Sequence, residues 1–149
     1  MILKANIIDT ERVEEPVHLE PCAGVIVAED DAAFRFLLDE ALREEGFEVL
    51  SAANGGEALE LYRKNAEKVS LAILDVTMPD MDGLTAATEM RKVDDNVFFL
   101  FTSGYERERL KERGINMEDI LNADFLFKPF TFKDMIDRMR RLGLLLHQS

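Results

Sequence analysis

Apolar residues fall into five short runs along this chain, and each run is followed by a longer stretch with apolar positions every three or four residues. Uninterrupted apolar runs are typical of strands buried on both faces, and the longer spacing is typical of amphipathic helices. In the second run the apolar residues Phe47 and Val49 alternate with the polar Glu48. This alternation predicts a half-exposed strand at the edge of a sheet. The predicted strands are 25–28, 47–51, 71–74, 97–101 and 125–127. The predicted helices are 32–45, 57–68, 84–92, a segment within 106–121, and 132–146.

Individual residues add detail to three of these helices. The apolar face predicted for the first helix comprises Phe34, Leu37, Leu38, Ala41 and Leu42. Gly46 ends this helix, and Gly114 with Asn116 interrupts or ends the fourth. The inward positions predicted for the last helix are Phe132, Met135, Ile136, Met139 and Leu142.

The regular alternation of strands and helices predicts an α/β fold, a doubly wound parallel sheet with helices on both faces. Right-handed crossovers leave few topologies for five strands. The flavodoxin-like order 2-1-3-4-5 places the alternating second strand at the edge and buries strands one, three and four. It also brings the carboxyl ends of strands one and three side by side at the switch point of the sheet.

The length of 149 residues and the 47% apolar content predict one globular domain, at 24–147. Residues 1–23 differ from the rest because they are acidic and carry Pro16 and Pro21, the composition of a linker. Cys22 is the only cysteine, so no disulfide forms within the chain, and a reducing, cytoplasmic compartment is expected. No apolar stretch reaches the 18 residues of a membrane span.

The formal net charge of −12 argues against direct nucleic-acid binding, which requires a basic face. Such a charge suits a domain that docks onto other proteins. An equally good interpretation is that the negative charge only keeps the domain soluble.

Polar side chains follow four of the predicted strands, where ligands bind in open α/β sheets. Glu29 and Asp30 follow the first strand, Asp75 the third, Thr102 the fourth and Lys128 the fifth. An acidic residue directly after a buried strand is costly unless it is used. We therefore expect these side chains to converge on one site.

This set of residues suits magnesium-assisted phosphoryl transfer to a carboxylate. Magnesium prefers oxygen ligands and relieves the repulsion between a carboxylate and a phosphoryl group. Asp30 and Asp75 are the predicted direct ligands, with Glu29 binding through water and the Thr77 carbonyl completing the protein share. Lys128 would supply a cation, and Thr102 a hydroxyl donor, to the charge that develops on the phosphoryl oxygens.

Neighbouring polar residues have simpler interpretations. Asp31 is interpreted as the N-cap of the first helix. Asp80 and Asp82 are interpreted as loop residues, and Ser103 could cap the fourth helix. The fold could also serve as a protein-interaction module that is not phosphorylated. A phosphatase of the haloacid dehalogenase class is disfavoured, because such enzymes need a second acid two residues after the nucleophile and Thr77 stands there.

Four segments together resemble the receiver domains of bacterial two-component response regulators: VAEDD at 27–31, LDVTMPDMDG at 74–83, FTSGY at 101–105 and FKPF at 127–130. The resemblance implies that Asp75 is the phosphoacceptor, that Glu29 and Asp30 are the acidic pair that binds Mg²⁺, and that Lys128 is the family's lysine. It also implies a switch formed by Thr102 and Phe125. Receivers often carry tyrosine at the latter position, so an output contact through that hydroxyl is absent here.

The segments 102–105 and 122–130 look most like receivers at the C-terminal end of hybrid sensor histidine kinases, which makes residues 1–23 an interdomain linker. The implied function is to accept a phosphoryl group from phosphohistidine on a sensor histidine kinase or a histidine phosphotransfer protein. The face of strand four, helix four, strand five and helix five would then change its contacts with other proteins or pair two copies in a homodimer. Self-catalysed phosphotransfer and autodephosphorylation are the only expected enzymatic steps.

Overall fold

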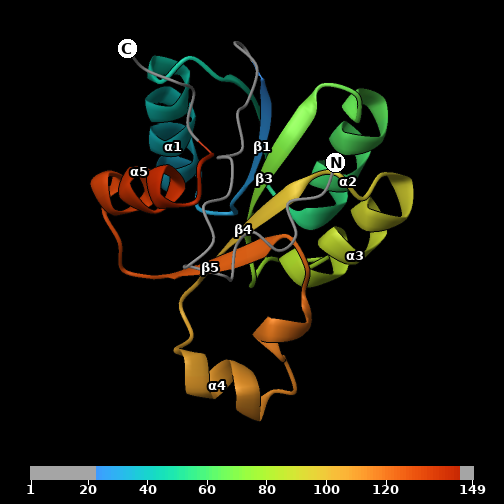
Figure 1. The fold of residues 1–149 in the computed structure, drawn as a ribbon, viewed down its shortest axis with the longest axis vertical. Coiled ribbons are helices and arrows are strands. Elements are labelled where there is room, and N and C mark those ends of the chain that lie inside the picture. The colour runs from blue at the N-terminus through green and yellow to red at the C-terminus, as the bar shows by residue number, and fades with distance from the viewer. Residues whose placement is uncertain (1–22, 145–149) are drawn as a thin grey trace.

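The computed structural model describes residues 23–144 and contains a five-stranded parallel sheet in the order β2-β1-β3-β4-β5 (Figure 1). The predicted α/β fold and its strand order are therefore confirmed. The strands are β1 Gly24–Ala28, β2 Glu48–Ala52, β3 Val69–Asp75, β4 Phe98–Ser103 and β5 Ala123–Phe127. Asp75, Thr102 and Ser103 thus belong to their strands, whereas the apolar runs predicted strands that stop before them.

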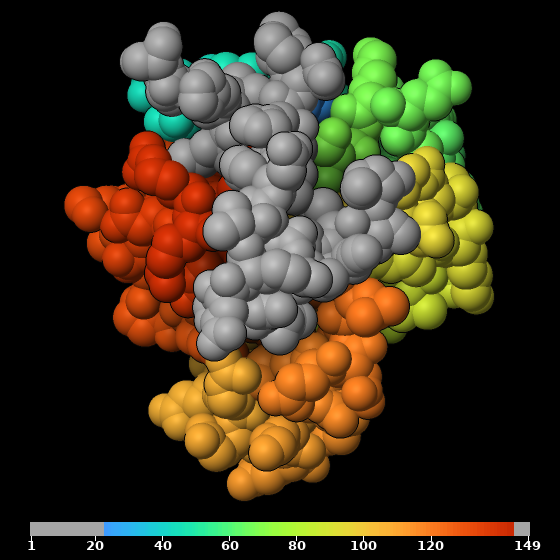
Figure 2. Space-filling view, viewed as in Figure 1, coloured from blue at the N-terminus to red at the C-terminus, as the bar shows by residue number. Residues whose placement is uncertain are grey.

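Helices cover both faces of the sheet, with α1 and α5 on one side and α2 and α3 on the other (Figure 1). Their bounds are α1 Ala32–Glu44, α2 Gly55–Asn65, α3 Gly83–Val93, α4 Arg107–Glu112 and α5 Phe132–Arg141. A 3₁₀ turn at Met117–Asp119 follows α4. The residues from α4 to the start of β5 form a lobe at the lower end of the molecule (Figure 2). None of the helices in 23–144 is long and apolar enough to cross a membrane.

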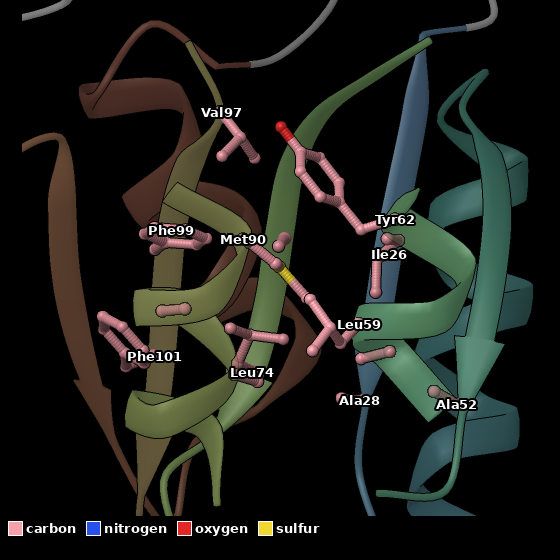
Figure 3. Close-up of a cluster of buried hydrophobic side chains, with 14 of the residues drawn as sticks. Ile26, Ala28, Ala52, Leu59, Tyr62, Leu74, Met90, Val97, Phe99 and Phe101 are labelled. Atoms are coloured by element: carbon pink, nitrogen blue, oxygen red, sulfur yellow. The ribbon is translucent and has the colours of Figure 1, made fainter. Parts of the chain in front are cut away.

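The alternation of side chains along each strand builds two separate cores. On β1, Val25 and Val27 pack toward α1 and α5, whereas Ile26 and Ala28 pack toward α2 and α3. Successive side chains of a strand point to opposite faces, so a continuous apolar run supplies both cores at once. The core on the α2 and α3 side includes Leu74, Met90 and the rings of Phe99 and Phe101 on β4 (Figure 3).

Side-chain caps fix where the helices begin. The Asp31 carboxylate accepts a hydrogen bond from Phe34 N at 3.1 Å, which confirms its predicted role as the α1 N-cap. The Asn54 side chain accepts from Glu57 N at 2.9 Å, so α2 begins at Gly55 rather than at residue 57. Such caps stabilise a helix because they satisfy backbone donors that have no partner within it.

Three details of the predicted helices are wrong. Leu37 is 62% exposed, because Leu38 and Leu42 form the buried stripe of α1. Helix α5 ends at Arg141, because Gly143 adopts a left-handed backbone with φ of 74°. Ser103 does not cap α4, because its hydroxyl bonds with the backbone of Tyr105. The interruption predicted near Gly114 is confirmed by the short α4 and the separate 3₁₀ turn.

The predicted linker at residues 1–23 lies outside the described residues apart from Ala23. That residue is buried, and its carbonyl accepts a hydrogen bond from Glu48 N at 3.0 Å. The predicted domain end at residue 147 also falls outside the described residues.

Candidate functional site

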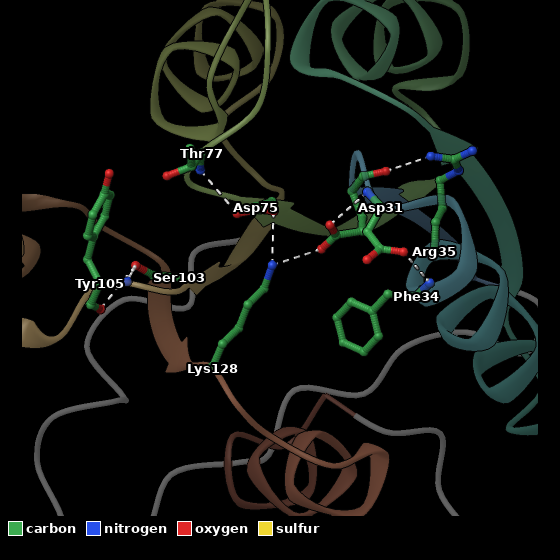
Figure 4. Close-up of polar contacts among 9 residues, drawn as sticks. Asp31, Phe34, Arg35, Asp75, Thr77, Ser103, Tyr105 and Lys128 are labelled. Carbon is green, nitrogen blue, oxygen red and sulfur yellow. Dashed lines mark hydrogen bonds and ion pairs between the residues drawn. The ribbon is translucent and has the colours of Figure 1, made fainter.

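The strand order brings the predicted polar residues to the carboxyl ends of neighbouring strands, where Figure 4 shows Lys128 pointing toward Asp75. Strands β1 and β3 are neighbours, so Glu29 at the end of β1 lies beside Asp75 at the end of β3. On the other side of β3, Asp75 pairs in register with Thr102 on β4. Lys128 follows β5, and its backbone N–H donates to the Ser103 carbonyl at 2.7 Å. Residues separated by up to 99 positions are thus in contact.

The Lys128 ammonium occupies the centre of this group. It lies 3.1 Å from Asp75 Oδ2 and 3.2 Å from Glu29 Oε1. The side chains of Glu29 and Asp75 are only 3% and 5% exposed, and that of Lys128 is 29% exposed. Buried carboxylates require a partner of opposite charge, and one lysine serves both.

Burial and the neighbouring charges shift the pKa values of Glu29 and Lys128. Burial raises the pKa of Glu29, the backbone N–H of Asp31 opposes this shift, and the charge of Asp75 adds to it. Burial alone would lower the pKa of Lys128, but hydrogen bonds and charges of Asp75 and Glu29 outweigh burial and raise it. Two carboxylates around one ammonium leave a negative balance, which favours binding of a further cation.

The donor set fits a hard divalent cation. Glu29, Asp30 and Asp75 each offer a carboxylate oxygen, and these atoms all lie within 4.8 Å of one another. Asp30 is exposed, so its carboxylate is open to solvent. Oxygen ligands with room for water are those that magnesium prefers. The role predicted for the Thr77 carbonyl stays a prediction, although the Thr77 N–H donates to Asp75 Oδ1 at 3.0 Å.

Thr102 and Phe125 are both buried. Thr102 is 2% exposed, and its carbonyl accepts a hydrogen bond from Val76 N at 2.8 Å. Phe125 is 4% exposed, with its ring 4.9 Å from that of Phe101. Arg138 donates to the Phe125 carbonyl at 2.7 Å and thereby ties β5 to α5. The Phe125 ring therefore lies in the core, against Phe101.

The loop after β3 contains a further capping residue. Asp82, interpreted from the sequence as a loop residue, is the N-cap of α3 and accepts from Thr85 N at 2.7 Å. Asp80 lies in the loop, as predicted, with a φ of 66°. Neither residue belongs to the carboxylate cluster.

Three residues that support the site were missed by sequence reasoning. The Phe34 ring lies 5.7 Å from Lys128 Nζ and 5.5 Å from the ring of Phe130. Arg35 donates to the Glu29 carbonyl at 2.7 Å. A Cβ on Gly83 would lie 2.3 Å from the Asp75 carbonyl oxygen, so only glycine allows the loop to return this close to β3. Phe34 and Arg35 stand in the first turn after the acidic pair, which was the available clue.

Comparisons with known proteins agree with this geometry. The family described as response regulator receiver domain matches residues 25–140. Sensor kinase CckA of Brucella abortus is 33% identical over 132 residues, which are 89% of this chain and 14% of that protein. Chemotaxis protein CheY of Bacillus subtilis is 31% identical over 121 residues, which are 78% of this chain and 94% of that protein. A crystal structure of the receiver domain from the hybrid histidine kinase CckA has a TM-score of 0.67 at 33% identity, covering 82% of this chain and 99% of that domain.

Proposed function

The chain belongs to the family of response regulator receiver domains, and on that premise we propose that Asp75 accepts a phosphoryl group from a phosphohistidine. The family resemblance drawn from four sequence segments is confirmed, including the similarity to receivers of hybrid histidine kinases. The chain spans 14% of the length of CckA and 94% of that of CheY, so it corresponds to the receiver portion of the kinase.

The observation that carries the proposal is the contact of Lys128 with two buried carboxylates. A lysine alone would suit a surface ion pair, and a carboxylate alone would suit a turn. Their convergence with Asp30 supplies a nucleophile, a cation and ligands for a metal within one site. Burying two carboxylates this close together costs stability, and clusters of this kind are found mainly at functional sites.

In the proposed step, a carboxylate oxygen of Asp75 forms a bond with phosphorus while the bond from phosphorus to the histidine nitrogen breaks. The imidazole keeps the electron pair of that bond. Lys128, 3.1 Å from Asp75 Oδ2, faces the negative charge on the transferred oxygens. Hydrolysis of the resulting acyl phosphate by water returns the carboxylate and inorganic phosphate, which accounts for the expected autodephosphorylation.

Magnesium is the proposed cofactor, held by Glu29, Asp30 and Asp75, with the Thr77 carbonyl as a further ligand. When bound, it reduces the repulsion between the Asp75 carboxylate and the incoming phosphoryl group. The protein residues position the acceptor: Thr77 N–H fixes Asp75 Oδ1, and Arg35 fixes the backbone at Glu29. These contacts orient the acids before the donor arrives.

The protein is proposed to be cytoplasmic, and its proposed partners are a sensor histidine kinase or a histidine phosphotransfer protein, with no direct contact to nucleic acid or membrane. Thr102 and Phe125 would couple the phosphoryl group to the face of β4, α4, β5 and α5. That face would change its protein contacts or pair two copies. A shift between two states requires contacts that differ between them, and the hydroxyl of buried Thr102 is available to provide one.

Acetyl phosphate with magnesium tests the proposal directly. We expect the mass of the intact chain to increase by one phosphoryl group, and Asp75→Asn to abolish this increase while the fold is kept. Asp80→Asn is the matched control, because it changes a nearby exposed loop carboxylate at a φ of 66°, which asparagine tolerates. Undiminished labelling of Asp75→Asn would contradict the assignment, and an unlabelled wild type would favour a phosphorylation-independent interaction module.

A further inference from the structure

Lys128 carries a long, flexible side chain, and its ion pairs are not its only contacts. Its ammonium lies 3.1 Å from Asp75 Oδ2 and 3.2 Å from Glu29 Oε1, yet the side chain is 29% exposed and has access to water. Holding a lysine in one conformation costs entropy, because the free side chain samples many rotamers. A further contact that fixes the ammonium therefore strengthens its pairing with Asp75.

The ring of Phe34 forms a third side of the surroundings of this ammonium. Lys128 Nζ lies over the ring, 5.7 Å from its centre, which is within the distance at which a cation is attracted to the face of an aromatic ring. Figure 4 shows the ring beside the lysine side chain, between that side chain and α1. The ammonium is thus held by two carboxylates and one ring from separate segments of the chain.

The Phe34 ring is itself fixed from two sides. Its backbone N–H donates to the Asp31 carboxylate at 3.1 Å in the first turn of α1. Its ring centre lies 5.5 Å from that of Phe130 with an angle of 59° between the planes, a tilted arrangement that aromatic pairs favour. Both rings are half-buried against the core on the α1 and α5 side. The ring therefore offers Lys128 a fixed contact.

This contact matters most when the proposed magnesium is bound. Glu29 and Asp75 pair with Lys128, and together with Asp30 they are the predicted metal ligands. A divalent cation on these carboxylates draws on the same negative charge and repels the ammonium. The Phe34 ring is not a metal ligand, so its attraction for the ammonium remains.

We propose that Phe34 is a positioning residue, whose ring holds the Lys128 ammonium against Asp75 while magnesium occupies the acidic cluster. The inference rests on the proposed phosphoacceptor function and deepens it, because the same lysine faces the transferred oxygens. Phe34 acts through Lys128 rather than on the reacting atoms, and Phe130 supports it through the contact between the two rings.

NMR of the full chain with ¹³C-labelled lysine tests the contact itself, without any phosphorylation. An aromatic ring shifts the signals of protons over its face upfield, and the Lys128 signal is identified by its loss in Lys128→Ala. Phe34→Leu removes the ring but keeps an apolar side chain, whereas Phe34→Tyr keeps the ring. With magnesium added, we expect the Lys128 Hε signal to stay upfield in wild type and Phe34→Tyr, and to move to the position of exposed lysines in Phe34→Leu.

Labelling by acetyl phosphate at saturating magnesium tests the consequence for phosphoryl transfer. Phe34→Leu should be labelled about fivefold more slowly than wild type, and Phe34→Tyr should restore the rate to within about twofold. Magnesium should bind both variants at least as tightly as wild type, since the three carboxylates remain. This measurement separates a displaced lysine from a damaged metal site.

Phe132→Leu is the control for lost packing, because it removes another half-buried ring from the same core. It should keep the wild-type rate. The proposal is overturned if the Lys128 signal is the same in wild type and Phe34→Leu, if Phe34→Leu is labelled as fast as wild type, if Phe34→Tyr does not restore the rate, or if Phe132→Leu slows labelling equally. An unlabelled wild type whose Lys128 signal still shows the ring would refute the phosphoacceptor function but not the contact.

Discussion

Lys128 Nζ lies 3.1 Å from Asp75 Oδ2, although β4 separates their strands in the sheet. The lysine therefore reaches across one strand to the proposed nucleophile and also meets Glu29 at 3.2 Å. Its single charge offsets part of the negative charge of two carboxylates that are almost fully buried, so the residue proposed to assist phosphoryl transfer also stabilises the fold. These two roles can be separated by measuring stability and phosphorylation in the same variants.

Lys128→Ala should lower the free energy of unfolding by about 2 kcal/mol without magnesium, because it leaves Glu29 and Asp75 buried without their cation. It should also slow labelling by acetyl phosphate and bind magnesium more tightly, since the metal no longer competes with an ammonium. Urea unfolding with and without magnesium measures the stability and the magnesium affinity, and the mass of the intact chain after acetyl phosphate treatment measures the labelling. Lys133→Ala removes an exposed lysine of α5 as a control and should change neither quantity appreciably. Equal magnesium affinity in wild type and Lys128→Ala would show that lysine and metal do not share these carboxylates.

Magnesium should raise the melting temperature of the wild type, because it binds the clustered carboxylates in the native state alone. Asp30→Ala should abolish this increase by removing one of three ligands. Asp31→Ala is the adjacent control: it should cost about 1 kcal/mol by loss of the α1 cap but keep the magnesium response. A full response in Asp30→Ala would exclude Asp30 as a ligand.

Sequence patterns predicted the sheet and the site better than the element ends, for a physical reason. Buried strands need continuous apolar runs, and the strand order then determines that Glu29, Asp75 and Lys128 meet. The extension of β3 to Asp75 and of β4 to Ser103 was missed, because polar residues inside a strand interrupt the apolar pattern. Helical spacing does not show which apolar positions at the border of a helix face pack against the sheet. The exposure of Leu37 was therefore not predicted.

Gly83→Ala should destabilise the domain by about 2 kcal/mol and impair labelling at Asp75, because the new Cβ would lie 2.3 Å from the Asp75 carbonyl oxygen. Gly104→Ala is the matched control, since a Cβ there meets no atom within 4 Å. Its free energy of unfolding should stay within about 0.5 kcal/mol of wild type. Chemical denaturation compares the two variants. Equal stability of both would mean that the loop after β3 moves away from the strand at little cost.

Asp39 should make stability depend on pH in the acidic range. Burial opposes its ionisation, but hydrogen bonds from Arg43 and Ser51 outweigh burial and lower its pKa from 3.8. The stabilisation is therefore present above pH 3.8 and is lost as the pH falls through the lower native-state pKa. Asp39→Asn should cost about 1 kcal/mol at pH 7, and its difference from wild type should shrink below about pH 4. Urea unfolding across this range measures the difference, and a constant difference down to pH 2 would contradict the assignment.

Thr102→Ala should separate phosphorylation from signalling. The variant keeps Asp75, Lys128 and the proposed magnesium ligands, so acetyl phosphate should still label it. It loses the hydroxyl that would connect the phosphoryl group to Phe125, while Thr102→Ser keeps that hydroxyl and serves as the control. The Phe125 ring is 4% exposed and its centre lies 4.9 Å from that of Phe101, so the change we expect is a repacking of these buried rings.

NMR shifts of residues 102–130, recorded with and without beryllofluoride as a phosphoryl mimic, distinguish these outcomes. Wild type and Thr102→Ser should respond along β4, α4 and β5, and Thr102→Ala should respond only near Asp75. The ring of Phe125 is coupled to this segment through Phe101, the residue that precedes Thr102 on β4, so the loss should extend to β5. A full wild-type response in Thr102→Ala would mean that the phosphoryl group reaches the output face by another route, with the loop after β3 or Lys128 as the remaining connections to the site.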